Sequence, residues 1–215
     1  MQLLLDAGTA VIADIFDSNG IEPPVLSENL FAIQPATRFA GPAYTILGAS
    51  VTFHEAGDRE KLAAIDGMGH GVVPVWAGSD IHGVCCFGDL LGEAMKIRGC
   101  EGVVVDGGIR DVAYLRELEL PVVARYRTPA QAIGRWKVTA HQVPVQVRGA
   151  LTEWVTVNPG DLVVADEDGV LAVPAADADS VAEEASQWAG AESEARDAIR
   201  QGMSLVAALD RYGHL

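Results

Sequence analysis

Strand-like and helix-like segments alternate along residues 39–125, and this alternation restricts the fold more than any other feature. Runs of β-branched and small residues predict strands at residues 39–52, 71–76, 102–105 and 121–125. The segments between them predict helices at residues 58–66, 89–98 and 112–119. Strands that alternate with helices in this way pair in parallel. The sequence therefore predicts an α/β fold around a parallel sheet.

The two ends of the chain carry other patterns. Residues 6–20 predict a helix that ends at Asn19 and Gly20. After residue 134, apolar runs between polar turns predict strands at residues 143–147, 154–157, 162–165 and 170–173. An acidic helix from residue 177 and a shorter one at residues 204–212 predict a helical tail, packed on the domain or on a neighbouring subunit. No linker or repeat interrupts the sequence, so we expect a single domain over residues 1–215.

Acidic residues outnumber basic residues, which limits the partners of the chain. The sequence holds 30 Asp and Glu residues against 15 Lys and Arg residues, and its formal net charge is -15. Nucleic acids and anionic membrane surfaces are bound through clustered Lys and Arg. We therefore expect no nucleic-acid partner and no membrane partner. A small anionic substrate is compatible with this charge, because its site needs only one or two local cations.

The first residues and the cysteines indicate a cytoplasmic protein. Asp6 and Asp14 interrupt the first apolar run, which has no basic segment, so we expect no signal peptide. The three cysteines are Cys85, Cys86 and Cys100. An odd number with two adjacent members is unsuited to a disulfide framework, and it fits buried thiols in a reducing compartment.

A glycine turn followed by a cation and an anion marks the first candidate site. The valine run at residues 103–105 leads into Asp106-Gly107-Gly108, which we expect to end the strand, and then into Arg110 and Asp111 at the start of a helix. Neighbours on a helix point in different directions, so we do not expect these two side chains to neutralise each other. An arginine fork suits a carboxylate, and an aspartate suits a divalent cation that keeps most of its waters. The pair predicts a site for a metal-chelated 2-oxo acid, with a surface ion pair as the alternative.

A helix start upstream forms the second candidate. Gly88, Asp89, Leu90 and Leu91 begin the predicted helix at residues 89–98. The free backbone N–H groups at such a start, together with the positive end of the helix dipole, favour an anion. Asp89 also fits the role of helix N-cap. Adjacent parallel strands would bring this segment beside Arg110 at the carboxyl ends of the sheet, where open α/β folds bind ligands.

These motifs, with others along the chain, carry a resemblance to a known family. They are residues 14–20, 38–45, 88–91, 98–99, 106–111, 159–166 and 212–213. The sequence resembles the RraA-like family, which includes 4-hydroxy-4-methyl-2-oxoglutarate and 4-carboxy-4-hydroxy-2-oxoadipate aldolases, regulators of ribonuclease activity, and proteins mislabelled as demethylmenaquinone methyltransferases. The resemblance implies a swivelling β/β/α sandwich with an N-terminal helix and a C-terminal helical tail. It also implies a homotrimer or a dimer of trimers with active sites between subunits.

The resemblance also implies an activity and roles for the candidate residues. The activity is that of a divalent-metal-dependent, class II-type aldolase, which cleaves a 4-hydroxy-2-oxo di- or tricarboxylic acid to pyruvate and a second oxo acid. Decarboxylation of oxaloacetate should accompany it, because the same enolate forms. The backbone amides of residues 88–91 and the side chain of Arg110 would hold the pyruvate moiety, and Asp111 would anchor Mg²⁺ or Mn²⁺ largely through water. An acidic residue of a neighbouring subunit, Glu192 or Glu194, would complete the site.

Some residues depart from the aldolase pattern and leave alternatives open. Many aldolase members carry an acidic residue four positions after the arginine, where this chain has Tyr114. His82 and Arg135 lie in segments unlike those of the aldolases and are candidates to shape a different pocket, although a lone histidine is more often structural. A non-catalytic, protein-binding regulator that resembles the ribonuclease inhibitors is the alternative function. A Schiff-base aldolase would have to use one of the lysines, which are Lys61, Lys96 and Lys137.

Overall fold

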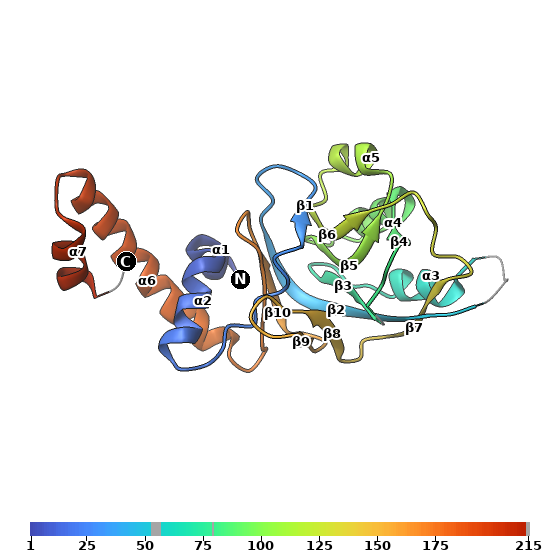
Figure 1. The fold of residues 1–215 in the computed structure, drawn as a ribbon, viewed down its shortest axis with the longest axis horizontal. Helices are drawn as coiled ribbons and strands as arrows, with labels where there is room; N and C mark the ends of the chain where they lie inside the picture. The colour runs from blue at the N-terminus through green and yellow to red at the C-terminus, as the bar shows by residue number, and fades with distance from the viewer. Residues whose placement is uncertain (53–56, 79, 214–215) are drawn as a thin grey trace.

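A strongly curved, mixed sheet lies at the centre of the computed structural model, which describes residues 1–52, 57–78 and 80–213 (Figure 1). The strand order is β1 (Phe31–Ala32), β6 (Val122–Arg127), β5 (Val103–Ile109), β3 (Val73–Ala77), β2 (Phe39–Ser50), β10 (Leu162–Ala165) and β11 (Val170–Val173). Two further strands join this sheet: β4 (Cys85–Phe87) pairs with β5, and β7 (Trp136–His141) pairs with β2. β8 (Val145–Arg148) and β9 (Trp154–Val157) form a separate antiparallel pair.

The centre of the sheet is parallel, as the alternation of strands and helices predicts. β2 pairs in parallel with β3, β3 with β5, β4 with β5, and β5 with β6. The helices α3 (Arg59–Asp66), α4 (Asp89–Ile97) and α5 (Val112–Glu117) connect these strands. The antiparallel strands β1, β7, β10 and β11 are added around this parallel core.

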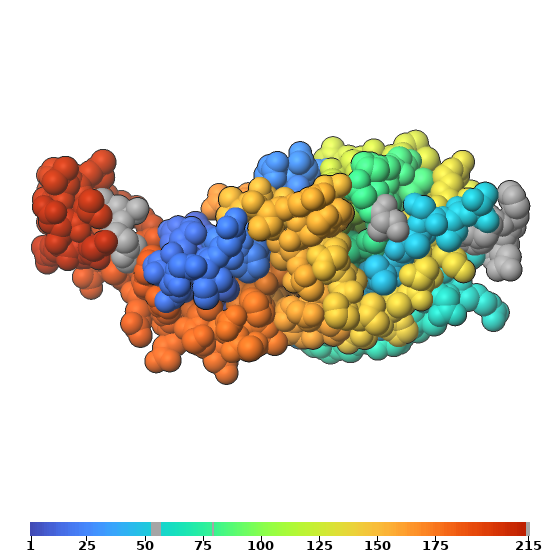
Figure 2. All heavy atoms as spheres, turned by 60° about the horizontal axis from the view of Figure 1, so that its bottom comes forward, coloured from blue at the N-terminus to red at the C-terminus, as the bar shows by residue number. Residues whose placement is uncertain are grey.

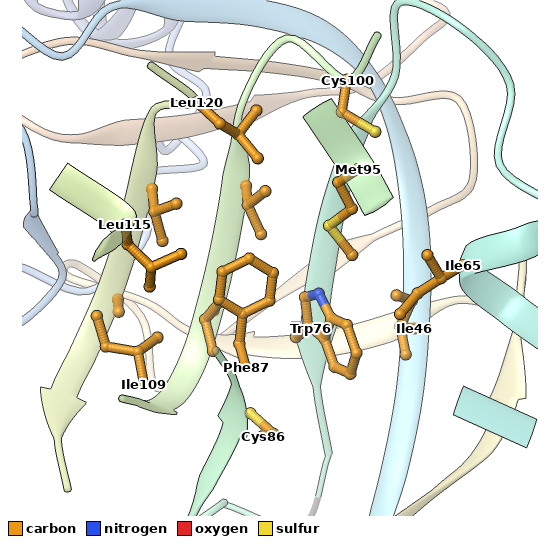
Figure 3. Packing of buried hydrophobic residues seen from close by; sticks show 14 of the residues in the cluster. Ile46, Ile65, Trp76, Cys86, Phe87, Met95, Cys100, Ile109, Leu115 and Leu120 are labelled. Carbon is orange, nitrogen blue, oxygen red and sulfur yellow. The ribbon is translucent and has the colours of Figure 1, made fainter. Parts of the chain in front are cut away.

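Both faces of the central strands are buried, which explains their continuous β-branched runs. Val103 and Val105 face a cluster that contains Met95 and Leu115 from the helices, whereas Val104 faces a second cluster with the valines of β8 and β9. Figure 3 shows Met95 of α4 and Leu115 of α5 over the sheet, with Trp76 and Phe87 between the elements. Each fully buried side chain of this size contributes about 1.5–3 kcal/mol relative to exposure.

The N-terminal helix predicted at residues 6–20 is wrong as a single element. The structure has α1 (Gln2–Ala7) and α2 (Thr9–Ser18), which are separated at Gly8. Gly8 has a φ of 89°, which favours glycine, and the Asp166 carboxylate accepts hydrogen bonds from the backbone N and the hydroxyl of Thr9 at 2.7 and 2.6 Å. Because Asp166 lies far from Thr9 in the sequence, the local sequence did not indicate that the helix would break at Gly8.

The C-terminal tail is helical, as predicted, and forms an arm. α6 (Ala178–Arg200) packs its first turns on α1 and α2 through Val181 and Ala185. Its second half and α7 (Leu205–Tyr212) project away from the sheet (Figures 1 and 2). In the described part of the chain, no helix combines the length and the apolar character that a membrane span needs.

The predicted end of the central strand at Asp106-Gly107-Gly108 is wrong. β5 continues through these residues to Ile109 and stays buried throughout. A Cβ atom on Gly108 would lie 2.4 Å from the carbonyl oxygen of Val84 and 2.5 Å from the Tyr126 ring. The glycine therefore allows the neighbouring strands to approach β5 closely, with a register irregularity between β5 and β6.

Candidate active site

Parallel pairing of β4 and β5 brings the two predicted segments together. β4 leads into α4, and β5 leads into Arg110 and Asp111. The backbone N of Arg110 donates to the carbonyl oxygen of Phe87 at 3.1 Å, and the backbone N of Asp89 donates to Oδ2 of Asp111 at 3.4 Å. The predicted juxtaposition of the α4 N-terminus with Arg110 and Asp111 is therefore confirmed.

Gly88 is required by this close approach. Its φ of -159° is open to any residue, so its backbone conformation does not demand glycine. A Cβ atom at this position would lie 2.7 Å from Oδ2 of Asp111 and 3.3 Å from Cγ of Arg110. Any larger residue would push the candidate pair away from α4.

Arg110 and Asp111 contact each other, contrary to the expectation from the sequence. Nε of Arg110 lies 3.3 Å from Oδ2 of Asp111, and the two side chains are 46% and 36% exposed. The expectation was wrong because neither residue lies within a helix: Arg110 follows β5, and Asp111 precedes α5 with a left-handed φ of 56°. A half-exposed ion pair contributes little stability, whereas a left-handed residue other than glycine costs energy and is enriched at ligand sites.

The first backbone amides of α4 are occupied by carboxylates. The N-cap residue is Gly88, so the expectation that Asp89 is the N-cap is wrong; Asp89 is the first helical residue. Oδ1 of Asp89 accepts from the backbone N of Leu90 at 2.7 Å, while Asp111 accepts from the backbone N of Asp89. These two carboxylates stand where the helix terminus would bind an anion. A substrate carboxylate would have to replace them.

A cavity of about 240 Å³ lies at this junction. It is lined by the predicted residues 88–91 and Arg110, by the start of α3, and by residues 131–133. On the other side of Arg110, a more open hollow of about 470 Å³ is bordered by Asp111, Arg127 and Thr128. Arg110 thus borders both spaces, whereas Asp111 lines the more open hollow and not the cavity.

Asp58 and the cysteines at the cavity have structural roles. The Asp58 carboxylate accepts from the backbone N of Lys61 at 3.1 Å and from the backbone N of Val138 at 2.9 Å, which ties α3 to β7. Burial raises the pKa of the Cys85 thiol, and it raises that of Cys86 to about 12. A buried neutral thiol is a poor nucleophile, so the prediction of buried, unpaired cysteines holds for these two residues.

Asp106 stands outside the cavity, although it belongs to the same motif as Arg110. Its carboxylate is 2% exposed and lies 3.2 Å from Nε of Arg125. Burial raises the pKa of Asp106, whereas the hydrogen bond from Arg125 holds the pKa of Asp80 well below its usual range. These residues form a charged cluster with Arg148 that joins β5 and β6 to β8.

Tyr114 faces away from the cavity. Its hydroxyl donates to the Glu93 carboxylate on α4, in a surface hollow that Arg110 does not line. This contact links α5 to α4. Tyr114, which departs from the aldolase pattern, therefore has a structural role here.

His82 and Arg135 occupy different places. Nε2 of His82 lies 2.7 Å from Asp80, in a hollow beside the charged cluster, so His82 does not shape the cavity. Arg135 donates to the carbonyl oxygen of Gln131 at 3.3 Å and therefore braces a segment that lines the cavity. Glu192 and Glu194 lie in the projecting half of α6, away from α4 and α5 (Figure 1).

The donors near Arg110 fit an open metal site. Among the described residues, no three His, Cys, Asp or Glu side chains gather into a metal-binding cluster. Oδ2 of Asp111 contacts Arg110 and the backbone N of Asp89, and Oδ1 has no partner among the described residues. One accessible carboxylate oxygen suits Mg²⁺ or Mn²⁺, because such ions keep several waters and use one or two protein carboxylates.

Comparisons with known proteins agree with this architecture. A family model named RraA-like (Aldolase/RraA) matches residues 9–172. A putative 4-hydroxy-4-methyl-2-oxoglutarate aldolase of Burkholderia multivorans is 32% identical over 164 residues, which are 76% of this chain and 95% of that protein. Protein DlpA of Legionella pneumophila is 28% identical over 99% of this chain, and the chain spans 33% of the length of DlpA.

A solved structure supports the same relationship. RraAS2 of Streptomyces coelicolor, an unusual member of the RNase ES inhibitor RraA protein family, matches with a TM-score of 0.77 and 28% identity. The match covers 91% of this chain and 94% of that chain. The α/β swivelling fold that the resemblance implied is therefore confirmed, and the chain belongs to the RraA-like family.

Proposed function

We propose that this protein is a divalent-metal-dependent aldolase that cleaves a 4-hydroxy-2-oxo acid to pyruvate and a second oxo acid. The observation that carries the proposal is that Asp111 contacts both Arg110 and the N-terminus of α4, while Arg110 and that N-terminus line one cavity. The name of the Burkholderia multivorans relative, a putative 4-hydroxy-4-methyl-2-oxoglutarate aldolase, supports the same activity.

Arg110 and the α4 amides would bind the pyruvate half of the substrate. The substrate C1 carboxylate takes the place of the Asp89 and Asp111 carboxylates at the helix N-terminus. The Arg110 guanidinium donates to the C2 oxygen, where negative charge develops. Asp111 would hold Mg²⁺ or Mn²⁺, which when bound supplies positive charge that polarises the C2 carbonyl.

The bond cleavage needs no external oxidant or reductant. A proton leaves the C4 hydroxyl, and the carbonyl of the second oxo acid forms at C4 as the C3–C4 bond breaks. The electron pair of that bond forms the C2–C3 double bond, and the π pair of the C2 carbonyl moves to its oxygen. The remaining enolate is protonated at C3 to give pyruvate. Asp89, once released from the backbone N of Leu90, would hold the water that accepts the hydroxyl proton. Loss of CO₂ from oxaloacetate gives the same enolate, so we also propose oxaloacetate decarboxylase activity.

A coupled pyruvate-release assay tests this proposal. We expect pyruvate from at least one 4-hydroxy-2-oxo acid in a panel and from oxaloacetate, with Mg²⁺ present. Absence of enzyme-dependent pyruvate from every acid in the panel would refute the aldolase.

Assembly into a homo-oligomer is part of the proposal. Leu90 and Ile97 on α4 are 77% and 81% exposed, and Leu205 and Val206 on the arm are 65% and 71% exposed. Apolar side chains left exposed on α4 and on the projecting arm fit contacts between copies. Light scattering should give three or six times the chain mass of 22.6 kDa. The same contacts would bring Glu192 or Glu194 of a neighbour toward the cavity; a stable, active monomer would contradict this part.

A non-catalytic, protein-binding regulator is the second candidate function. The net charge of -15 favours it, because such a surface suits a basic partner, and RraAS2 is a member of the RNase ES inhibitor RraA family. Inhibition of a ribonuclease that is unchanged by Arg110→Lys, together with no pyruvate release, would favour the regulator.

A further inference from the structure

The cavity at Arg110 has a second basic side chain in its wall. Lys61 of α3 lines it together with Asp58 and Leu62. Of the described residues that line this cavity, only Lys61 and Arg110 are basic. The two come from different elements, because Arg110 follows β5 whereas Lys61 belongs to the helix that packs on α4.

The backbone of Lys61 is held in place, and its ammonium is not engaged by the part of the chain that the structure describes. Asp58 caps α3 through the backbone N of Lys61, and its other oxygen binds the backbone N of Val138. Asp89, another acidic residue of the cavity wall, binds the backbone N of Leu90. The Lys61 ammonium has no ion pair or hydrogen bond with the residues that the structure describes.

The positive charges of both basic side chains reach the same residue of the cavity wall, Cys85. The Cys85 thiol lines the cavity, and burial raises its pKa. The positive charges of Arg110 and, more weakly, Lys61 oppose this shift of the Cys85 pKa. The lining also includes neutral side chains such as Cys86, Ala132 and Ile133. A compact ligand with an anionic group for each cation fits this distribution.

We propose that Lys61 binds the second carboxylate of the substrate and selects dicarboxylic over monocarboxylic 2-oxo acids. The inference rests on the proposed function for its reaction, but its binding test does not depend on turnover. The C1 carboxylate lies at Arg110 and the α4 amides, and the distal carboxylate lies at the Lys61 ammonium. A volume of about 240 Å³ suits such a small acid, since pockets for drug-sized ligands span about 300–1,000 Å³.

Binding of two related acids separates this role from a structural one. 2-Oxoglutarate carries a distal carboxylate and lacks the C4 hydroxyl, whereas pyruvate carries only the C1 group. We expect titration calorimetry with Mg²⁺ to show that Lys61→Gln weakens 2-oxoglutarate binding roughly tenfold, as loss of one charge-assisted hydrogen bond would. Pyruvate affinity should stay within about twofold of the wild-type value, because its contacts remain.

Two further variants serve as controls. Lys61→Arg keeps the charge and should retain most of the affinity for 2-oxoglutarate. Lys96→Gln removes a lysine that pairs with Glu119 at 3.4 Å outside the cavity, and it should change neither affinity. Equal weakening of both acids by Lys61→Gln, or no weakening of 2-oxoglutarate, would overturn the assignment.

Kinetics then separate the assignment from the proposed function. Lys61→Gln should raise KM for 4-hydroxy-4-methyl-2-oxoglutarate by roughly tenfold, with a smaller change in kcat, and should spare the monocarboxylate 4-hydroxy-2-oxopentanoate. A wild-type enzyme that cleaves no acid would refute the aldolase, while the calorimetric comparison would still decide the role of Lys61. A borohydride-trapped pyruvate adduct on Lys61 would overturn the assignment in favour of a Schiff base.

Discussion

Replacing Gly88 by alanine should separate the role of the site from the stability of the fold. The added Cβ would stand 2.7 Å from Oδ2 of Asp111, whereas ordinary van der Waals contact begins at 3.4 Å. Asp111 must therefore retreat by about 0.7 Å, the difference between these two distances. The retreat would break its hydrogen bond with Asp89 and shift its contact with Arg110, which already lies 3.3 Å from the new atom at Cγ.

The expected loss of activity is large and the expected loss of stability is small. A misplacement of about 1 Å at a reacting centre can cost about 100-fold in rate, so we expect kcat/KM to fall by about that factor. The broken hydrogen bond costs about 0.5–1.5 kcal/mol, and the lower entropy of an unfolded chain with alanine offsets about 0.4–1 kcal/mol. The melting temperature should therefore move by no more than about 4 °C.

Gly92→Ala is the matched control on the same helix. Its Cβ would lie 2.8 Å from Cδ2 of Leu118 and 2.9 Å from Cδ2 of Leu115, both buried between α4 and α5. Overpacking of this kind costs about 1–3 kcal/mol and should lower the melting temperature by about 2–12 °C. Turnover per folded molecule should change far less than in Gly88→Ala.

Pyruvate release and thermal melting at one protein concentration measure both effects. Full activity in Gly88→Ala would show that the position of Arg110 and Asp111 against α4 does not matter for the reaction. Equal losses of turnover in both glycine variants would show that α4 as a whole, and not its first residues, governs activity.

Three further perturbations test the site and the core. Arg110→Lys keeps the charge but not the planar fork, so kcat should fall by the equivalent of about 2–4 kcal/mol while the melting temperature stays near the wild-type value; unchanged turnover would make Arg110 structural. Excess chelator should abolish pyruvate release, and Mg²⁺ or Mn²⁺ should restore it; full activity in chelator would refute metal dependence. Burial raises the pKa of Cys86 to about 12 and that of Cys100 to about 11, so above pH 9 the unfolded thiols lose protons that the folded ones keep. Urea unfolding should then show stability falling as pH rises from about 9 to 11, by up to about 1.4 kcal/mol per pH unit for each thiol, and the Cys86→Ala variant should show a smaller slope.

The parallel core was predictable because each strand carries its own signal. The β-branched runs around Val75, Val104 and Val123 are buried on both faces, and such burial leaves a continuous apolar pattern in the sequence. β4 has three residues and β1 has two, so their composition alone could not identify them. Gly107 and Gly108 indicated a turn by residue type, yet the close approach of neighbouring chain segments explains the glycine at 108.

The site was predictable as far as it depends on neighbouring parallel strands. Gly88 and Arg110 come together because β4 pairs in parallel with β5; the sequence predicted adjacent parallel strands here but did not identify β4 itself. The contact between Arg110 and Asp111 was not predictable, since it depends on the left-handed conformation of Asp111. Lys61 entered the sequence analysis only as a Schiff-base lysine, because its place in the cavity wall depends on how α3 packs.

The carboxylates at the start of α4 lead to one more prediction, which concerns how the metal and the substrate bind. Oδ2 of Asp111 is engaged by the backbone N of Asp89 and by Arg110. A ligand carboxylate that takes over these two donors would release this oxygen for Mg²⁺, so each ligand should strengthen the binding of the other by the same factor.

Acetate isolates this effect, because it offers a carboxylate but no 2-oxo group with which to chelate the metal. We expect calorimetry to show that saturating acetate raises Mg²⁺ affinity roughly fivefold; this factor is the lower end of typical coupling between sites. Chloride at equal ionic strength is the control. Gly88→Ala should abolish the coupling, because Asp111 is already displaced from α4 in that variant. If pyruvate raises Mg²⁺ affinity and acetate does not, the coupling comes from chelation alone, and the exchange of carboxylates at the α4 N-terminus is not part of substrate binding.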